Sequence, residues 1–508
     1  MTPNPGPAID RRSFLGLLGG AAAAASPAAA IPARSAEDRP FVGIQVQPHS
    51  FYDEGIDRVL DNVERAEINT LLIYSHLFAA AADVPLETLA PDHGVAPRDP
   101  RGRTFRRIWA RPTPGLYDGL PLSFADDPPE AEHAGRDLFA DLIEPCRRRG
   151  IKRMARILVP SGSKTKGRIP GWNAVRQVDL DGRPSDEGCL NNPDFREFWA
   201  RAAADVVGNN DLDGFMIGAE RPGPLLDVVQ NGKPAWCFCE HCLARMADAG
   251  VDVDRARIAF RALGTWRANA ASGDRPAGGV ISALLGVFFQ YPELLAWERE
   301  WATAFDEFVA HVGRAVRTAR PGATFGRHID HQQTSWDIFH RAACNIGRMA
   351  ADVDFLKPVT YHEIMGPRTR LWVIDRQREA LLSELSGPRA LDLFHALTGT
   401  DPSREPRFEE LIHRGFSPDY VGRETSRFVE GADGRCAVYP GIAMDVPMYM
   451  PDPPSPRRLF DSDPEGLITA VHRAFDAGAT GVIACREYQE MRLTSLDAIG
   501  QAVRERTG

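Results

Sequence analysis

Residues Asp213 to Cys242 read DGFMIGAERPGPLLDVVQNGKPAWCFCEHC, and this stretch is the most informative part of the sequence. It opens with a short apolar run, 214–218, which is typical of a buried parallel strand. The run leads to a carboxylate, Glu220, and the chain then enters a loop rich in proline and glycine. Because α/β barrels place their functional groups at the carboxyl ends of inner strands, the stretch predicts a barrel strand that presents an acid.

Seven further apolar runs, each ending in polar or aromatic residues, recur along the chain. The eight predicted strands are 42–46, 70–74, 152–159, 214–220, 324–328, 354–360, 438–444 and 480–484. Amphipathic helices are predicted between them at 55–66, 134–149, 193–207, 296–318, 335–350 and 464–477, the third with Asn192 as its N-cap. Eight alternating units predict one (β/α)8 TIM barrel over about 39–506. An open doubly wound sheet is the alternative, but the loop after Val46 lacks the glycine-rich turn that such a fold uses to bind phosphate.

Three connections are too long for a plain loop and helix, namely those after the second, fourth and sixth strands. They predict long βα-loop insertions that wall the barrel mouth, and 91–129, rich in proline, arginine and aspartate, is expected to be an irregular part of that wall. Such walls suit a bulky polar ligand, for example an oligosaccharide. Four tryptophans in or near these loops either stack on sugar rings or pack the loops: Trp172, Trp236, Trp297 and Trp336.

The amino-terminal segment predicts export. A pair of arginines, Arg11 and Arg12, precedes an apolar run from Leu15 to Ala25 and then small residues, the pattern of a bacterial twin-arginine signal over 1–36. The run is shorter than the roughly 20 residues that a membrane-spanning helix needs. We therefore expect a periplasmic or secreted protein with no stable membrane span after signal cleavage.

The composition excludes other classes of protein. The net charge is −9, basic and acidic residues are interspersed, and no run of lysine and arginine indicates nucleic acid as a partner. Eight cysteines in 508 residues are too few for a disulfide scaffold. No organic cofactor is expected, and the sequence leaves the oligomeric state open.

Four acids stand at predicted strand ends and are the candidate catalytic residues: Glu220, Glu363, Asp445 and Glu487. A glycosidic bond is typically cleaved by two carboxyl groups, about 5–5.5 Å apart for retention and about 6.5–9.5 Å apart for inversion. Glu220 is predicted to be the general acid, because the apolar residues before it indicate a wall that favours its protonated form. Asp445, Glu487 and Glu363 are the candidates for its partner. The alternative for Glu220 is a structural salt bridge to a nearby arginine.

Further polar side chains at the same predicted rim are candidates for binding sugar hydroxyls. They are His49, His76, Arg156, Arg221, His328, His331, Tyr361, His362, Arg486 and Tyr488. Any one of these histidines is more often a satisfied hydrogen-bonding residue than a catalyst, but five at strand ends indicate a binding site.

The loop after the fourth strand carries a cysteine cluster, Cys237, Cys239 and Cys242. Tetrahedral zinc needs a fourth ligand, which either Cys189, after the third strand, or His241 could supply. We predict a closed structural zinc site that braces the loop behind Glu220. Disulfides are the alternative in a periplasmic protein.

Part of this pattern resembles known carbohydrate-active barrels. Asp213, Gly214 and Phe215, followed by Glu220, keep the spacing of the chitinase-type strand-four signature, although Met216 and Gly218 stand where that family has two further acids. The overall pattern, with Cys189-Leu-Asn-Asn-Pro193 and the Cys-x-Cys-x-x-Cys loop, is similar to glycoside-hydrolase-like barrels of bacteria. The resemblance implies a carbohydrate substrate and a glycosidase.

Two other functions stay open. An acid-and-histidine centre of the kind in xylose-isomerase-like barrels, made of Glu220, Asp330, His362 and Glu487, could bind Mn²⁺, Mg²⁺ or Zn²⁺ and isomerise or epimerise a sugar. The second is a barrel that binds carbohydrate and catalyses no reaction.

Overall fold

The computed structural model describes residues 39–77, 91–94, 104, 106–110, 112–160, 168–331, 337–451, 454–457 and 459–507. The chain divides into two units, Met1–Pro40 and Phe41–Gly508, and every element below belongs to the second. The predicted signal segment 1–36 lies outside the described residues, and so does Trp336.

The second unit is built on one parallel sheet. Its strands are β1 (Phe41–Val46), β2 (Thr70–Tyr74), β3 (Lys152–Val159), β6 (Gly214–Ala219), β7 (Thr324–Ile329), β8 (Phe355–Pro358), β9 (Ala437–Val438), β10 (Gly441–Ala443) and β13 (Gly481–Cys485). They pair in the order β10-β13-β1-β2-β3-β6-β7-β8-β9. All eight predicted strands are present.

The sheet closes on itself at the seventh predicted strand. That strand is split into β9 and β10 at Tyr439 and Pro440, and a proline cannot donate to the ladder. β9 pairs with β8 on one side, β10 pairs with β13 on the other, and Val359 bridges Gly441 between them. The predicted (β/α)8 barrel is therefore confirmed.

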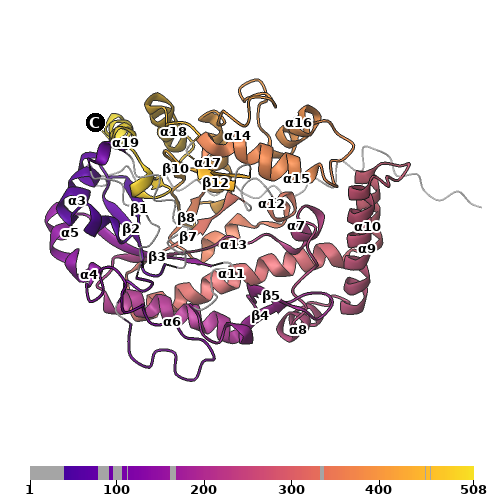
Figure 1. Cartoon of the computed structure of the whole chain (residues 1–508), viewed down its shortest axis with the longest axis horizontal. Helices are drawn as coiled ribbons and strands as arrows, with labels where there is room; N and C mark the ends of the chain where they lie inside the picture. The colour runs from indigo at the N-terminus through magenta and orange to yellow at the C-terminus, as the bar shows by residue number, and fades with distance from the viewer. Residues whose placement is uncertain are drawn as a thin grey trace, which may run out of the picture. The chain divides into compact units, whose positions relative to one another are not determined.

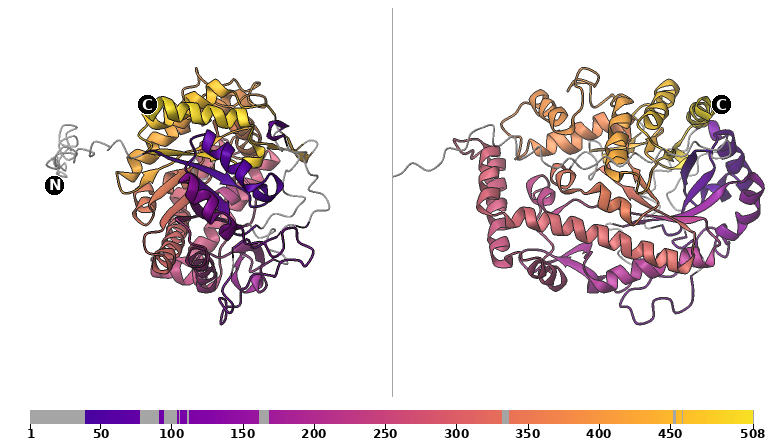
Figure 2. Two further views of the ribbon diagram at one scale, coloured as in Figure 1. Left: turned by 90° about the vertical axis from the view of Figure 1, so that its left-hand side faces the viewer. Right: turned by 180° about the vertical axis from the view of Figure 1, so that it is seen from behind.

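Helices surround the barrel (Figures 1 and 2). They are α3 (Ile56–Arg65), α5 (Ile143–Arg149), α6 (Pro193–Asn209), α11 (Glu293–Ala319), α13 (Ile346–Ala351), α17 (Asp419–Ala432), α18 (Pro464–Asp476) and α19 (Leu493–Thr507). The predicted start of α6 is confirmed, since the Asn192 side chain accepts a 3.1 Å bond from the Phe195 N–H. Two predicted helices are each divided in two: 134–149 into α4 (Leu138–Asp141) and α5, and 335–350 into α12 (Ile338–Ala343) and α13.

The interior of the barrel changes from apolar to polar along the strands. Alternate residues of a strand face the same side, so the interior receives every second side chain. Its apolar layers include Leu72, Met154, Met216, Phe355 and Ile483. Towards the carboxyl ends the interior receives polar groups instead, from Tyr74, Arg156, His328, Lys357 and Glu487.

The insertions after β6 and β8 form a second core beside the barrel. The first holds α7 (Pro224–Val229), α8 (Glu240–Asp248), α9 (Val253–Ser272) and α10 (Val280–Gln290), and the second holds α14 (Met365–Arg368), η8 (Thr369–Ile374), α15 (Asp375–Gln377) and α16 (Gly387–Thr398). One hydrophobic cluster contains residues of both, among them Phe260, Trp297 and Phe394. Figure 1 shows α9 and α10 at the end of this unit opposite α3 and α5. Trp172, Trp236 and Trp297 are all buried, which favours the loop-packing interpretation for them.

No single described helix is long and apolar enough to cross a bilayer; α10 and α11 meet that test only as a pair bent by 81°.

Candidate active site

Glu220 lies just beyond the end of β6, at the mouth of the barrel. Its side chain is 53% exposed, and its Oε1 lies 3.5 Å from Nε2 of His328. The next residue, Arg221, faces the other way, as neighbours on an extended chain do. The Arg221 guanidinium is buried, donates to the Gly188 carbonyl and lies over the ring of Phe195. The predicted alternative, a salt bridge, therefore does not arise from Arg221.

Glu487 follows β13 and is buried. Its Oε1 lies 3.4 Å from a terminal nitrogen of Arg156, whose guanidinium stacks over the ring of Tyr74 at 4.1 Å. Its Oε2 is buried and accepts no hydrogen bond from the part of the chain that the structure describes. Burial raises the pKa of Glu487 to about 7, although the charge of Arg156 opposes the shift. Glu487 is thus a carboxyl group that can gain or lose a proton near neutral pH.

Tyr74 links the two acids. Burial raises the pKa of its phenol, and the negative charges of Glu487 and Glu220 both raise it further. A single phenol that both carboxylates influence indicates that they face one mouth. Arg156 and Tyr74 lie beside each other because they are register partners on β3 and β2.

Lys357 is part of this group and is absent from the predicted site. It is fully buried, and its Nζ lies 3.4 Å from Nδ1 of His328 and 3.3 Å from the hydroxyl of Tyr361. The sequence does contain a signal for this residue, because Lys357 is a lysine within an otherwise apolar strand, Phe-Leu-Lys-Pro. A charged residue there is unusual unless it has partners inside the barrel.

Glu363 and Asp445 form a separate buried network. Asp445 accepts bonds from the backbone and side chain of Arg492, at 2.8 and 3.0 Å, and from the backbone of Ser462. The Ser462 hydroxyl donates to Glu363. Burial raises the pKa of Glu363 to about 8, and the neighbouring Asp445 charge adds to the shift. Asp445 is therefore occupied in holding the start of α19, and Glu363 is a neutral carboxyl at pH 7.

The remaining predicted rim histidines are buried. Burial lowers the pKa of His76 to about 3, and its ring packs on Phe124. Burial lowers the pKa of His362 to about 4. His331 meets the ring of Tyr361 edge-on at 5.2 Å, and His49 is buried beyond β1. At pH 7 the first two are neutral and can both donate and accept hydrogen bonds.

One predicted residue, Tyr488, points away from the mouth. Tyr488 donates from its hydroxyl to Glu54 at 3.0 Å and accepts from Asn62 at 2.8 Å, so its side chain faces α3. Arg486 pairs with Glu490 on the short turn that follows, and its charge also acts on Glu487, Tyr361 and Tyr74 at the mouth. The structure therefore brings Glu220, Glu487, Arg156, His328 and Tyr361 together, with Tyr74 and Lys357 added.

The predicted isomerase centre is not assembled. Within the described ranges, two groups bring three or more metal-ligating atoms to within 4.8 Å of one another, the four cysteines and the trio Asp53, Glu132 and His133. Neither contains a member of the predicted acid-and-histidine centre.

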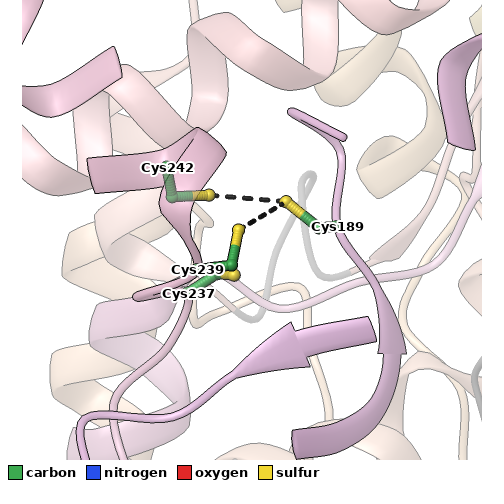
Figure 3. A group of neighbouring side chains, drawn as sticks. All are labelled: Cys189, Cys237, Cys239 and Cys242. Carbon is green, nitrogen blue, oxygen red and sulfur yellow. Dashed lines mark hydrogen bonds between the residues drawn. The ribbon is translucent and has the colours of Figure 1, made fainter. Parts of the chain in front are cut away.

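The four cysteines converge as the predicted zinc site requires (Figure 3). Cys189 Sγ lies 3.4 Å from Cys239 Sγ and 3.5 Å from Cys242 Sγ. These separations are far longer than a disulfide bond of about 2.05 Å and fit thiolates around zinc with Zn–S near 2.3 Å. His241 instead faces Glu240, with 3.8 Å between their nearest nitrogen and oxygen. The donor set therefore fits tetrahedral zinc.

Surrounding groups support thiolates in this cluster. The side-chain nitrogen of Asn191 lies 3.2 Å from Cys242 Sγ, and its backbone N–H points at Cys189 Sγ from 3.4 Å. Mutual bonds among the four cysteines lower the pKa of Cys239 and raise the pKa values of Cys237 and Cys242. The cluster joins the turn after β5 (Pro184–Gly188) to the start of α8.

Comparisons with known proteins bear on the fold. No family model and no curated protein sequence matches the chain. Among solved structures, a β-galactosidase from the Antarctic haloarchaeon Halorubrum lacusprofundi aligns with a TM-score of 0.50 at 13% identity, covering 92% of this chain and 58% of that one. A β-galactosidase from the psychrophilic Marinomonas ef1 gives 0.49 at 11%, with 92% and 59% covered. The exo-β-1,4-mannosidase Op5Man5 from Opitutaceae bacterium strain TAV5 gives 0.40 at 12%, with 92% and 60% covered.

The first of these likenesses shows the fold. The chain has the (β/α)8 barrel found in glycoside hydrolases. It spans less than two thirds of the length of the three proteins named.

Proposed function

We propose that this chain is a glycoside hydrolase whose two catalytic carboxyl groups are Glu220 and Glu487. The observation that carries the proposal is the pairing of one exposed and one buried carboxyl group around Tyr74 and Arg156 at one barrel mouth. The barrel shared with glycoside hydrolases supports it. Asp445 is left out of the pair because Arg492 and Ser462 already engage its carboxylate.

The environments of the two acids favour different roles. A glycosidase needs one protonated carboxyl group, to assist the leaving oxygen, and one ionised carboxylate. Glu487 is buried and its pKa is about 7, so it suits the general acid. Glu220 is half exposed beside the ring nitrogen of His328 and suits the ionised partner. This assignment differs from the sequence-based prediction, in which the apolar run before Glu220 favours Glu220 as the general acid.

The test is a pair of isosteric substitutions with a matched control. Against a panel of aryl glycosides and oligosaccharides, Glu487→Gln should lower the rate by about 10²–10⁴-fold for poor leaving groups and much less for good ones, because only the former need a proton. Glu220→Gln should lower it for both kinds of leaving group. Glu363→Gln is the control, since this buried carboxyl is already neutral at pH 7 and should keep full activity.

Three outcomes would contradict the proposal. Full activity of both glutamine variants would remove the two acids from the chemistry. Binding of a glycan without any cleavage would select the non-catalytic barrel. Activity that is lost with a chelator and restored by Mn²⁺ would select the sugar isomerase.

Two further properties belong to the same proposal. The four cysteines would hold a structural zinc ion behind the loop that follows Glu220. The twin-arginine pattern of 1–36 supports export of the folded protein to the periplasm or beyond, where its carbohydrate substrate would be met. Metal analysis of the purified protein and the amino terminus of the exported chain test them separately.

A further inference from the structure

A buried lysine stands behind Glu220. Lys357 on β8 and His328 on β7 are register partners in the parallel sheet. The Lys357 Nζ lies 3.4 Å from Nδ1 of His328, and Nε2 of the same ring lies 3.5 Å from Oε1 of Glu220. Three side chains from neighbouring strands therefore form a line that ends on a proposed working carboxylate.

Two glycines leave the space that this line occupies. A Cβ on Gly218, which lies two residues before Glu220, would approach the Cβ of His328 to 2.9 Å and its Cδ2 to 3.0 Å. A Cβ on Gly441 would approach the Cε of Lys357 to 2.6 Å and its Nζ to 2.9 Å. Real Cβ atoms essentially never come closer than 3.0 Å to such neighbours, so both positions need glycine while the pair keeps its present geometry.

The chemistry of the line sets the direction of its hydrogen bonds. Burial lowers the pKa of Lys357; in its ammonium form Lys357 can only donate, so His328 Nδ1 must then accept from it. Burial lowers the pKa of His328 to about 4, helped by the charge of Lys357, so the ring is neutral at pH 7 and carries one proton. That proton is then on Nε2, which faces Glu220. The other charged or titratable groups around Lys357 are Arg156, His331, Tyr361, Cys485 and Glu487.

We propose that Lys357 is a positioning residue for Glu220, holding His328 in the tautomer whose Nε2–H faces the carboxylate. Such a donor stabilises the ionised form of Glu220 and fixes its orientation. The two separations are long for hydrogen bonds, as catalytic contacts commonly are before substrate binds. The expected effect of Lys357 on catalysis rests on the proposed function, whereas the expected position of the proton on His328 does not.

The first experiment needs no activity. Long-range ¹H–¹⁵N correlation on the full chain should find the His328 proton on Nε2 in the wild type and a large share of it on Nδ1 in Lys357→Met. Arg153→Met is the matched control, because this buried cation bonds to the Phe139 and Asp211 carbonyls outside the barrel, and it should leave the tautomer unchanged. A proton on Nδ1 in the wild type, or an unchanged tautomer in Lys357→Met, would overturn the proposal.

The second experiment separates the two ring nitrogens. A glutamine amide can present its N–H where Nε2 stood, whereas an asparagine amide reaches only the place of Nδ1. His328→Gln should keep kcat/KM within a few fold, and His328→Asn should lower it about tenfold or more, the value of a hydrogen bond to a charged group.

The two proposals fail in different ways. Full activity of Glu220→Gln would remove the proposed function and leave the tautomer result standing. Equal losses in His328→Gln and His328→Asn, with Glu220→Gln inactive, would keep the proposed function and overturn the role of Lys357. A misfolded Lys357→Met leaves the decision to the two His328 variants and to the wild-type tautomer.

Discussion

Replacing His93 by glutamine should destabilise the fold more at pH 6 than at pH 9. The His93 ring is buried between two acceptors, since Nδ1 lies 2.9 Å from a carboxylate oxygen of Glu54 and Nε2 lies 2.7 Å from the Met491 carbonyl. A neutral imidazole has only one N–H, so both bonds together require the imidazolium. This cation fastens the turn that follows Glu487 to Glu54, two residues before α3.

The direction of the pH effect follows from the pKa of His93. Burial lowers it, but the bond and charge of Glu54 and the bond to Met491 outweigh burial, and the net pKa lies above the ordinary 6.5. A histidine with a raised pKa in the folded state contributes its full stabilisation below the unfolded pKa, near 6.5, and loses it as the pH rises through the folded pKa.

The magnitude follows from the burial of the pair. The side chains of His93 and Glu54 are 0% and 1% exposed, and removing one partner of a buried ion pair costs about 3–5 kcal/mol. His93→Gln should lie at the lower end, about 3 kcal/mol at pH 6, because its amide still donates. Urea unfolding followed by circular dichroism at both pH values measures the difference.

The control is a histidine at the surface. His472 lies 3.2 Å from Glu505, with both side chains substantially exposed, so His472→Gln should change the unfolding free energy by less than about 1 kcal/mol at either pH. If His93→Gln lost the same stability at pH 9 as at pH 6, the buried imidazolium would be refuted.

Three further changes test other parts of the molecule. If the cysteine cluster holds zinc as proposed, Cys239→Ser should lower the zinc content and the melting temperature, as measured by metal analysis and calorimetry. Gly218→Ala should displace the His328 ring and lower activity about tenfold with a largely unchanged fold, since overpacking typically costs about 1–3 kcal/mol. Asp445→Asn should leave Arg492 poorly paired and destabilise by about 3 kcal/mol, without the leaving-group dependence expected of a catalytic acid.

The fold was predictable because each barrel strand is buried on both faces. Such strands are short apolar runs between amphipathic helices, and this pattern needs no knowledge of distant partners. The division of two predicted helices, into α4 and α5 and into α12 and α13, was not predictable in the same way. Asn345 interrupts a region of helical pattern, and its side chain caps α13 by accepting from the Arg348 N–H, a local competition that periodicity does not capture.

The candidate site was predictable in position and less so in roles. Strand ends indicated Glu220 and Glu487, but not which acids are already engaged, because Arg492 and Ser462 reach Asp445 from elsewhere in the chain. Lys357 was not predicted as a site residue, because its role depends on the strand register that pairs it with His328. Register comes from the closure of the whole sheet, which no single strand specifies.

One alternation at the end of β6 joins the candidate active site to the cysteine cluster. Glu220 turns into the mouth, and Arg221 turns outward to the carbonyl of Gly188, the residue before Cys189. A metal that holds Cys189 against the start of α8 would therefore also hold the acceptor that anchors Arg221. The position of Glu220 depends on that anchor through a single peptide unit. The cysteine cluster thus has a structural route to the chemistry without contributing a ligand or a proton to it.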